Sequence, residues 1–147
     1  MRSFVVDASV GAKWFLPAAA EPLASEAQRL LALYTQGRVR LLVPDLFWPE
    51  LGNILWKATL QGRITQQDAE LSVARACQLG LLVLPSVDLV AQALTLAVAS
   101  RRTVYDSVYI AAAMSESVPF LTADERLVNA TGARLPVRWL GALPGLL

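Results

Sequence analysis

The chain has 147 residues, 55% of them apolar and 17% charged, and its formal net charge is +1. A chain of this length is expected to bury about 70% of the surface that it exposes when unfolded, which suffices for one core and predicts a single domain over residues 1–147. It contains no histidine and one cysteine, which excludes histidine-based catalysis, histidine- or cysteine-rich metal sites and an internal disulfide.

The predicted elements alternate between strands and helices. Runs of β-branched and aromatic residues predict strands at residues 3–6, 38–43, 119–122 and 137–140, while residues 81–84 fit either a strand or a connector. Apolar residues at helical spacing predict helices at residues 23–34, 48–58, 65–79, 86–100, 103–117 and 124–130. This alternation predicts an α/β fold with a mostly parallel sheet that is covered on both faces.

Two helical stretches carry specific predictions about burial. Cys77 shares helical spacing with Ala69, Val73 and Ala76, so we expect its side chain in the core. Residues 89–100 are apolar at nine of twelve positions, which predicts a helix buried all round, against a second subunit or a partner. The longest uncharged runs have twelve residues, too few to cross a bilayer, and no secretory signal is recognised. A cytoplasmic protein without membrane segments is therefore expected.

Two acidic residues directly follow predicted strands. Asp7 comes after residues 4–6, and Asp124 comes after residues 120–123. The carboxyl ends of parallel strands share one edge of a sheet, where ligands bind near the point at which strand order reverses. Both side chains are therefore expected at one candidate ligand site. The alternative for each is a helix N-cap, a position that aspartate commonly fills.

Two further acidic residues lie on predicted helices. Glu50 borders the apolar stripe that includes Leu51 and Ile54, and Asp106 precedes Tyr109 and Ile110 by three and four residues. Burial of an isolated charge is strongly unfavourable unless the charge is paired or binds a metal. The alternatives are salt bridges to arginine or, for Asp106, a helix cap.

Convergence of the four acidic residues would gather a formal charge of −4 in one cleft. Mutual repulsion would then raise some of their pKa values unless a cation entered. Oxygen ligands favour Mg²⁺ or Mn²⁺ among catalytic metals, and such an ion can activate water for attack on a phosphate ester. This chemistry requires no histidine, so it is compatible with the composition.

Four segments of the chain resemble the PIN-domain ribonucleases of the VapC-like toxin group. The segments are FVVDAS at residues 4–9, VPD at 43–45 with PELGNIL at 49–55, TVYDSVYIA at 103–111 and FLTADERL at 120–127. Their order and spacing cover nearly the whole chain. The resemblance implies a three-layer α/β/α sandwich, Mg²⁺-dependent RNA cleavage (with Mn²⁺ as an alternative), a homodimer and inhibition by a cognate VapB-like antitoxin.

The resemblance also assigns roles to individual residues. It implies an acidic metal-binding quartet of Asp7, Glu50, Asp106 and Asp124, with Ser9 and Thr122 as supporting polar residues. Some relatives carry a further acidic or polar ligand beyond the last aspartate, for which Glu125 and Asn129 are the choices here. The number of metal ions, one or two, is therefore left open.

Several cationic residues lie close in sequence to the proposed acidic quartet. Arg101, Arg102, Arg126 and Lys13 are candidates for contacts with RNA phosphates. The alternative for the Arg101–Arg102 pair is a solvated helix end, where arginine complements the helix dipole. The four tryptophans are expected in the core or in interfaces rather than stacked on bases: Trp14, Trp48, Trp56 and Trp139.

Two other functions compete with that of a metal-dependent endoribonuclease. The first is a catalytically inactive module of the same fold that binds RNA or protein, but such a module has no use for four clustered carboxylates. The second is a phosphate-accepting receiver or an aspartate-nucleophile phosphatase, which also places an aspartate after its first strand. The phosphatase requires a second aspartate two residues after the first, and here that position is Ser9.

Overall fold

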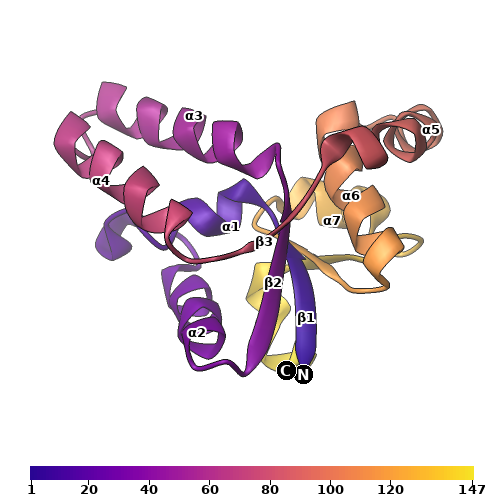
Figure 1. The fold of residues 1–147 in the computed structure, drawn as a ribbon, viewed down its shortest axis with the longest axis horizontal. Coiled ribbons are helices and arrows are strands. Elements are labelled where there is room, and N and C mark those ends of the chain that lie inside the picture. The colour runs from indigo at the N-terminus through magenta and orange to yellow at the C-terminus, as the bar shows by residue number, and fades with distance from the viewer.

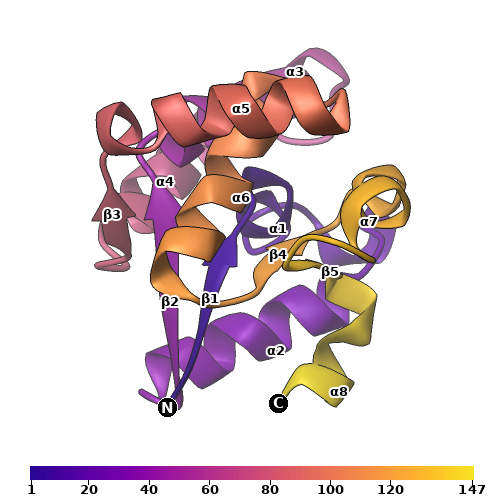
Figure 2. The ribbon, with the colours of Figure 1, turned by 90° about the vertical axis from the view of Figure 1, so that its right-hand side faces the viewer.

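The computed structural model describes residues 1–147 and contains one five-stranded sheet flanked by helices (Figures 1 and 2). The strands are β1 (Arg2–Val6), β2 (Val39–Pro44), β3 (Leu82–Leu84), β4 (Phe120–Thr122) and β5 (Val137–Trp139). Their order is β3-β2-β1-β4-β5, and every neighbouring pair is parallel. The α/β prediction is confirmed, and the ambiguous segment at residues 81–84 provides an edge strand.

Eight α-helices connect and cover the strands. They are α1 (Ala8–Ala12), α2 (Ala24–Thr35), α3 (Phe47–Leu60), α4 (Gln66–Cys77), α5 (Val90–Ser100), α6 (Val104–Glu116), α7 (Glu125–Thr131) and α8 (Leu143–Leu146). Short 3-10 turns occur at Ala18–Ala20, Ser86–Asp88 and Leu140–Ala142. Because α3 begins at Phe47, Pro49 lies in its first turn, where the missing N–H costs no helical hydrogen bond. No helix is long and apolar enough to cross a membrane.

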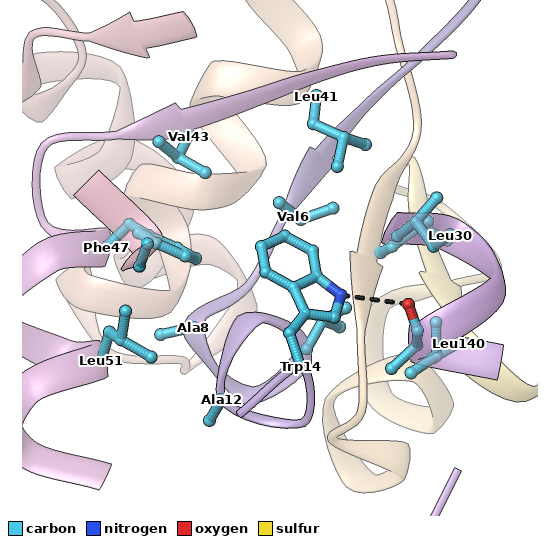
Figure 3. Packing of buried hydrophobic residues seen from close by; sticks show 14 of the residues in the cluster. Val6, Ala8, Ala12, Trp14, Leu30, Leu41, Val43, Phe47, Leu51 and Leu140 are labelled. Atoms are coloured by element: carbon cyan, nitrogen blue, oxygen red, sulfur yellow. Dashed lines mark hydrogen bonds between the residues drawn. The ribbon is translucent and has the colours of Figure 1, made fainter. Parts of the chain in front are cut away.

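Alternating side chains of β1 divide the core between the two faces of the sheet. Phe4 and Val6 pack with residues of α1, α2 and α3, whereas Val5 packs with residues of α6. Figure 1 shows the sheet between these two groups of helices. Trp14 lies in the first group, and its indole Nε1 donates to the backbone oxygen of Ala27 over 3.0 Å (Figure 3). The core therefore fixes α1, directly after β1, against α2 and α3.

The helix α4 corrects one burial prediction. Thr65 caps it, and its hydroxyl accepts a hydrogen bond from the Asp68 N–H over 3.0 Å. Cys77, however, is exposed, and its neighbour Ala76 is fully buried. Adjacent helical residues point about 100° apart, so only one of the two can face α3. The expectation of a buried Cys77 is wrong.

The helix α5 is buried on only one face within the chain, and its predicted burial against a second subunit or a partner stays a prediction. Ala93 is its only buried residue, whereas Val90, Leu94 and Val98 are 46%, 57% and 75% exposed. The helix packs on α6, which itself lies between α5 and the sheet (Figure 2). One face of α5 is therefore covered, and burial all round does not occur within the chain.

Candidate acidic site

Asp7 and Asp124 lie at the carboxyl edge of the two neighbouring strands β1 and β4. The strands pair in register at Val6 and Leu121, and the Asp7 N–H donates to the Leu121 carbonyl over 3.0 Å. The strand order reverses at β1, which has β2 on one side and β4 on the other. The two aspartates therefore lie where a doubly wound sheet binds its ligands. Both chain termini lie at the opposite end of the sheet (Figure 1).

The carboxylate of Asp7 is held by two hydroxyl groups. Ser9 Oγ donates to Asp7 Oδ2 over 2.9 Å, and Thr122 Oγ1 donates to the same oxygen over 2.7 Å. Both hydroxyls therefore leave Oδ1 available to another ligand. Burial raises the pKa of Asp7, although the two hydroxyl donors oppose this change. Asp7 starts α1 without a side-chain capping bond, so the N-cap alternative does not account for its carboxylate.

The same hydroxyl groups also position the segment that carries Asp124. Thr122 Oγ1 accepts from the Asp124 N–H over 3.0 Å, and Ser9 Oγ accepts from the Ala123 N–H over 3.2 Å. Thr122 is fully buried. Asp124 Oδ1 in turn accepts from the Leu127 N–H over 3.2 Å, so Asp124 does cap α7. One hydrogen-bond network thus joins the ends of β1 and β4, and the capping bond leaves Asp124 Oδ2 unused.

Glu50 and Asp106 extend the acidic site from the first turns of α3 and α6. Burial, followed by the charges of Asp7 and Asp106, raises the pKa of Glu50 to about 7. Burial and the charge of Asp124 raise the pKa of Asp106, while Arg102 and the Thr103 hydroxyl oppose this rise. Each of the four carboxylates is therefore near enough to at least one of the others for their charges to repel.

None of the four carboxylates forms a salt bridge. The structure contains two such pairs, both to Glu21: Lys13 Nζ and Arg63 Nη2 each lie 2.7 Å from a Glu21 carboxylate oxygen. The salt-bridge alternatives for Glu50 and Asp106 are therefore wrong. Asp106 instead occupies the N3 position of α6, where its backbone N–H donates to Thr103 Oγ1 over 3.1 Å. The nearby Arg102 charge acts on its carboxylate without forming a salt bridge to it.

The donor atoms fit a hard divalent cation, although the carboxylates are not closed around one position. No group of three or more of them is close enough to hold a metal ion as the side chains stand. Glu50 Oε1 is nevertheless buried without a hydrogen-bond partner, and such an oxygen is costly to leave unsatisfied. Carboxylate oxygens that repel one another and lack a donor are the ligands that Mg²⁺ or Mn²⁺ prefers.

Two polar residues beside the acidic residues were not predicted. Ser107 and Tyr109 are buried on α6, and neither hydroxyl has a hydrogen-bond partner. The Tyr109 ring stacks on Phe120, with ring centroids 5.2 Å apart, and its hydroxyl lies near Glu50 without forming a hydrogen bond of normal geometry. Tyr109 is three residues after Asp106 and so shares its helix face, but the sequence pattern presents it as an apolar residue.

The predicted phosphate-binding residues occupy different surroundings. Arg102 Nη2 donates to the Arg126 carbonyl over 3.0 Å, and its charge acts on Asp106, so it lies beside the acidic site. Arg101 and Arg126 are exposed. Lys13 is buried and pairs with Glu21, so it is not an exposed cation beside the acidic site. Of the tryptophans beyond Trp14, Trp48 and Trp139 are half-buried, and Trp56 is exposed.

The family follows from a comparison of the sequence with protein-family models. The model of the PIN domain matches residues 4–133. The chain belongs to the PIN domain family. No curated protein sequence matches it. The family match covers all four acidic residues of the site and the whole sheet except the first two residues of β1 and the strand β5.

Three solved structures share the PIN fold with this chain. PAE2754 from Pyrobaculum aerophilum is 24% identical, with a TM-score of 0.71 and coverage of 99% of this chain and 89% of that one. VapC20 from Mycobacterium tuberculosis, a sarcin-ricin loop cleaving toxin, is 16% identical, with a TM-score of 0.63 and coverage of 90% of this chain and 95% of that one. VapBC2 from Rickettsia felis, bound to a promoter DNA fragment, is 8% identical, with a TM-score of 0.63 and coverage of 93% of this chain and 98% of that one.

Proposed function

We propose that this PIN domain is a metal-dependent endoribonuclease and the toxin of a toxin–antitoxin pair. The observation that carries the proposal is the set of four unpaired carboxylates at the carboxyl edge of the sheet. The fold shared with the VapC20 toxin and with VapBC2 supports it. The substrate is RNA, and the cofactor is Mg²⁺, with Mn²⁺ as a substitute.

The four carboxylates of Asp7, Glu50, Asp106 and Asp124 would hold the metal ion. When bound, such an ion activates water and offsets negative charge on the reacting phosphate. Ser9 and Thr122 fix the orientation of Asp7, since both donate to its Oδ2 atom. Glu50, with a pKa of about 7 before metal binding, can exchange a proton near neutral pH. Arg102, whose charge acts on Asp106, would contact the substrate phosphate.

Two apolar surfaces fit the proposed protein partners. The side chains of Val90, Leu94 and Val98 are exposed on α5, and the edge strand β3 also exposes apolar side chains. We assign these apolar surfaces to a homodimer. An open groove of about 710 Å³ between α3 and α4, lined in part by Trp56 and Leu60, fits an apolar segment of a VapB-like antitoxin.

A nuclease assay with purified protein tests the proposed function. The full chain should cleave total RNA in Mg²⁺ or Mn²⁺ and lose this activity in EDTA. Asp7→Asn and Asp106→Asn should each abolish cleavage while the far-UV circular dichroism spectrum stays unchanged. Asp88→Asn, an exposed carboxylate outside the site, provides the matched control and should retain activity. Undiminished cleavage in EDTA would exclude the metal-dependent mechanism.

The same experiment tests the alternative of a catalytically inactive module that binds RNA or protein. The open arrangement of the carboxylates is the observation that favours this alternative. An inactive module would bind RNA without cleaving it at any concentration of Mg²⁺ or Mn²⁺. It would also show no thermal stabilisation by these ions, because ligand binding to the native state raises the unfolding temperature.

A further inference from the structure

A pocket separate from the acidic site lies where α5 and α7 end. It has a volume of about 250 Å³, and half of its lining residues are apolar. The polar half consists of Arg101, Arg134, Ser100 and Thr131, of which the two hydroxyls already donate to backbone carbonyls and the two arginines carry the charge. Both helices lie on the α6 side of the sheet (Figure 1) and face the viewer in Figure 2. The lining contains no carboxylate. The pocket is therefore separate from the acidic residues and opposite to them in charge.

The charge of this pocket is positive even after the helix dipoles are counted. Neither Arg101 nor Arg134 takes part in the salt bridges of the structure, which both involve Glu21. The carboxyl ends of α5 and α7 each contribute roughly half a negative charge, about one in total, against two guanidinium charges. The helix dipoles therefore offset only about one of the two positive charges. The remainder favours an anion.

Arg101 has a backbone conformation that an arginine rarely adopts. It ends α5 in the left-handed region, with φ 55° and ψ 35°. Glycine is the usual residue at such a position because it has no Cβ to clash with the backbone. The Arg101 side chain is exposed, so neither a salt bridge nor core packing compensates for this strain. A ligand for its guanidinium group would give the strained arginine a role.

A line of arginines connects the pocket with the acidic site. Arg102 follows Arg101, lies beside Asp106 and donates to the carbonyl of Arg126 in the first turn of α7. Asp124 caps the start of α7, and the pocket lies at its end. A helix of seven residues is about 10 Å long. A few nucleotides of an RNA strand can span this distance.

We propose that Arg101 and Arg134 bind a phosphate of the RNA strand that flanks the scissile phosphate. This inference rests on the proposed ribonuclease function and adds a specific substrate contact to it. The planar guanidinium group matches the oxygens of a phosphate with two parallel hydrogen bonds. Arg134 was not among the predicted RNA-binding residues, because it is distant in sequence from all four acidic residues.

The proposed dimer leaves this phosphate pocket open. At 100° per residue, Leu96 and Ser100 project from α5 on the side opposite to Val90, Leu94 and Val98. The former pair lines the pocket, and the latter three form the exposed apolar stripe. A second copy seated on the stripe would therefore leave the α5 side of the pocket uncovered.

RNA binding without catalysis tests the phosphate pocket. The probe is a fluorescent twelve-nucleotide single-stranded RNA, titrated with the full chain in EDTA over a series of salt concentrations. The double variant Arg101→Gln with Arg134→Gln should weaken binding at least tenfold and reduce the slope of log K against log salt by about 0.7, the value for one lost phosphate contact on a single strand. The matched control, Arg40→Gln with Arg75→Gln, removes two exposed arginines elsewhere and should leave both values unchanged.

Two further readouts separate this phosphate contact from a structural role and from the proposed function. Arg101→Gly should raise the unfolding temperature, because it relieves the left-handed strain, and should still weaken RNA binding. In Mg²⁺, the double glutamine variant should raise KM with kcat nearly unchanged. If the double variant binds RNA with the affinity and salt slope of the wild type, and the wild type cleaves RNA, the phosphate-pocket proposal is wrong and the ribonuclease proposal stands. Arginine-dependent binding by a wild-type chain that cleaves no RNA would instead overturn the ribonuclease proposal.

Discussion

Thr122 joins the ends of β1 and β4 through its hydroxyl group, which donates to Asp7 Oδ2 over 2.7 Å and accepts from the Asp124 N–H over 3.0 Å. A single buried hydroxyl thereby sets the relative position of two acidic residues that are 117 positions apart. A valine of similar shape would remove both bonds without leaving a cavity. The relationship between Thr122 and Asp7 is therefore open to a direct test.

Thr122→Val should weaken metal-dependent cleavage. Loss of the Thr122 donor raises the pKa of Asp7 further and frees its carboxylate to rotate. Partners of this kind typically change metal affinity by about 10- to 100-fold. We expect the Mg²⁺ concentration at half-maximal activity to rise by at least tenfold, while Thr122→Ser, which retains the hydroxyl, stays close to wild type. Equal Mg²⁺ dependence in the valine and serine variants would contradict this role.

The raised pKa of Glu50 predicts that the free energy of unfolding falls as the pH rises in the absence of metal. Its pKa rises from about 4.5 to about 7 on folding, so the folded chain holds its proton more tightly than the unfolded chain. Stability is then fully present below pH 4.5 and is lost as the pH rises through 7. Glu50 is partly exposed, and solvent screening reduces the effect to about 1 kcal/mol. Urea unfolding in EDTA at pH 5 and pH 8 measures it.

A glutamine at position 50 provides the control for this pH effect. Glu50→Gln cannot ionise, so its change in stability between pH 5 and pH 8 should be smaller than that of the wild type. At pH 8, Mg²⁺ should increase the stability of the wild type more than that of the variant, because the Glu50 carboxylate is a proposed ligand. A wild-type stability that rises from pH 5 to pH 8 in EDTA, relative to the variant, would contradict the raised pKa.

The agreement between the predicted and observed fold has identifiable physical limits. Long periodic segments such as α2 and α6 and the strands β1 and β2 could be predicted, because burial of one face imposes a spacing on the sequence. Parallel topology was also enough to bring Asp7 and Asp124 to one edge. The five-residue helix α1 could not be predicted, because it is too short to show a period.

Other features depend on contacts between distant segments. A stripe that includes both Ala76 and Cys77 does not reveal which residue faces α3. The pairing of Lys13 with Glu21 requires the chain to turn back after α1, so Lys13 looked like a free cation near Asp7. Tyr109 presented only its apolar ring in the sequence pattern, although its hydroxyl lies at the acidic site.

The pairing of Glu21 with Lys13 predicts acid sensitivity of the fold. Burial raises the pKa of Glu21, but hydrogen bonds and charges from Lys13 and Arg63 outweigh burial and lower it. The resulting stability is present above pH 4.5 and is lost as the pH falls below that value. Glu21→Gln leaves the buried Lys13 ammonium unpaired and should cost about 3 kcal/mol at pH 7. Denaturant unfolding measures this loss, and Glu116→Gln, an exposed carboxylate without a partner, should cost less than 0.5 kcal/mol.

The exposed face of α5 predicts the oligomeric state. Val90, Leu94 and Val98 repeat every four residues and form one apolar stripe, which a second copy of the chain would bury. Leu94→Glu combined with Val98→Glu places charges in that interface, and burial of unpaired charges is strongly unfavourable. Sedimentation velocity should show a dimer for the wild type and a monomer for the double variant, with the same unfolding temperature at high dilution. Leu71→Glu, which charges an exposed apolar position on α4, should remain dimeric. A wild-type monomer at 100 µM, or a dimeric double variant, would remove α5 as the interface.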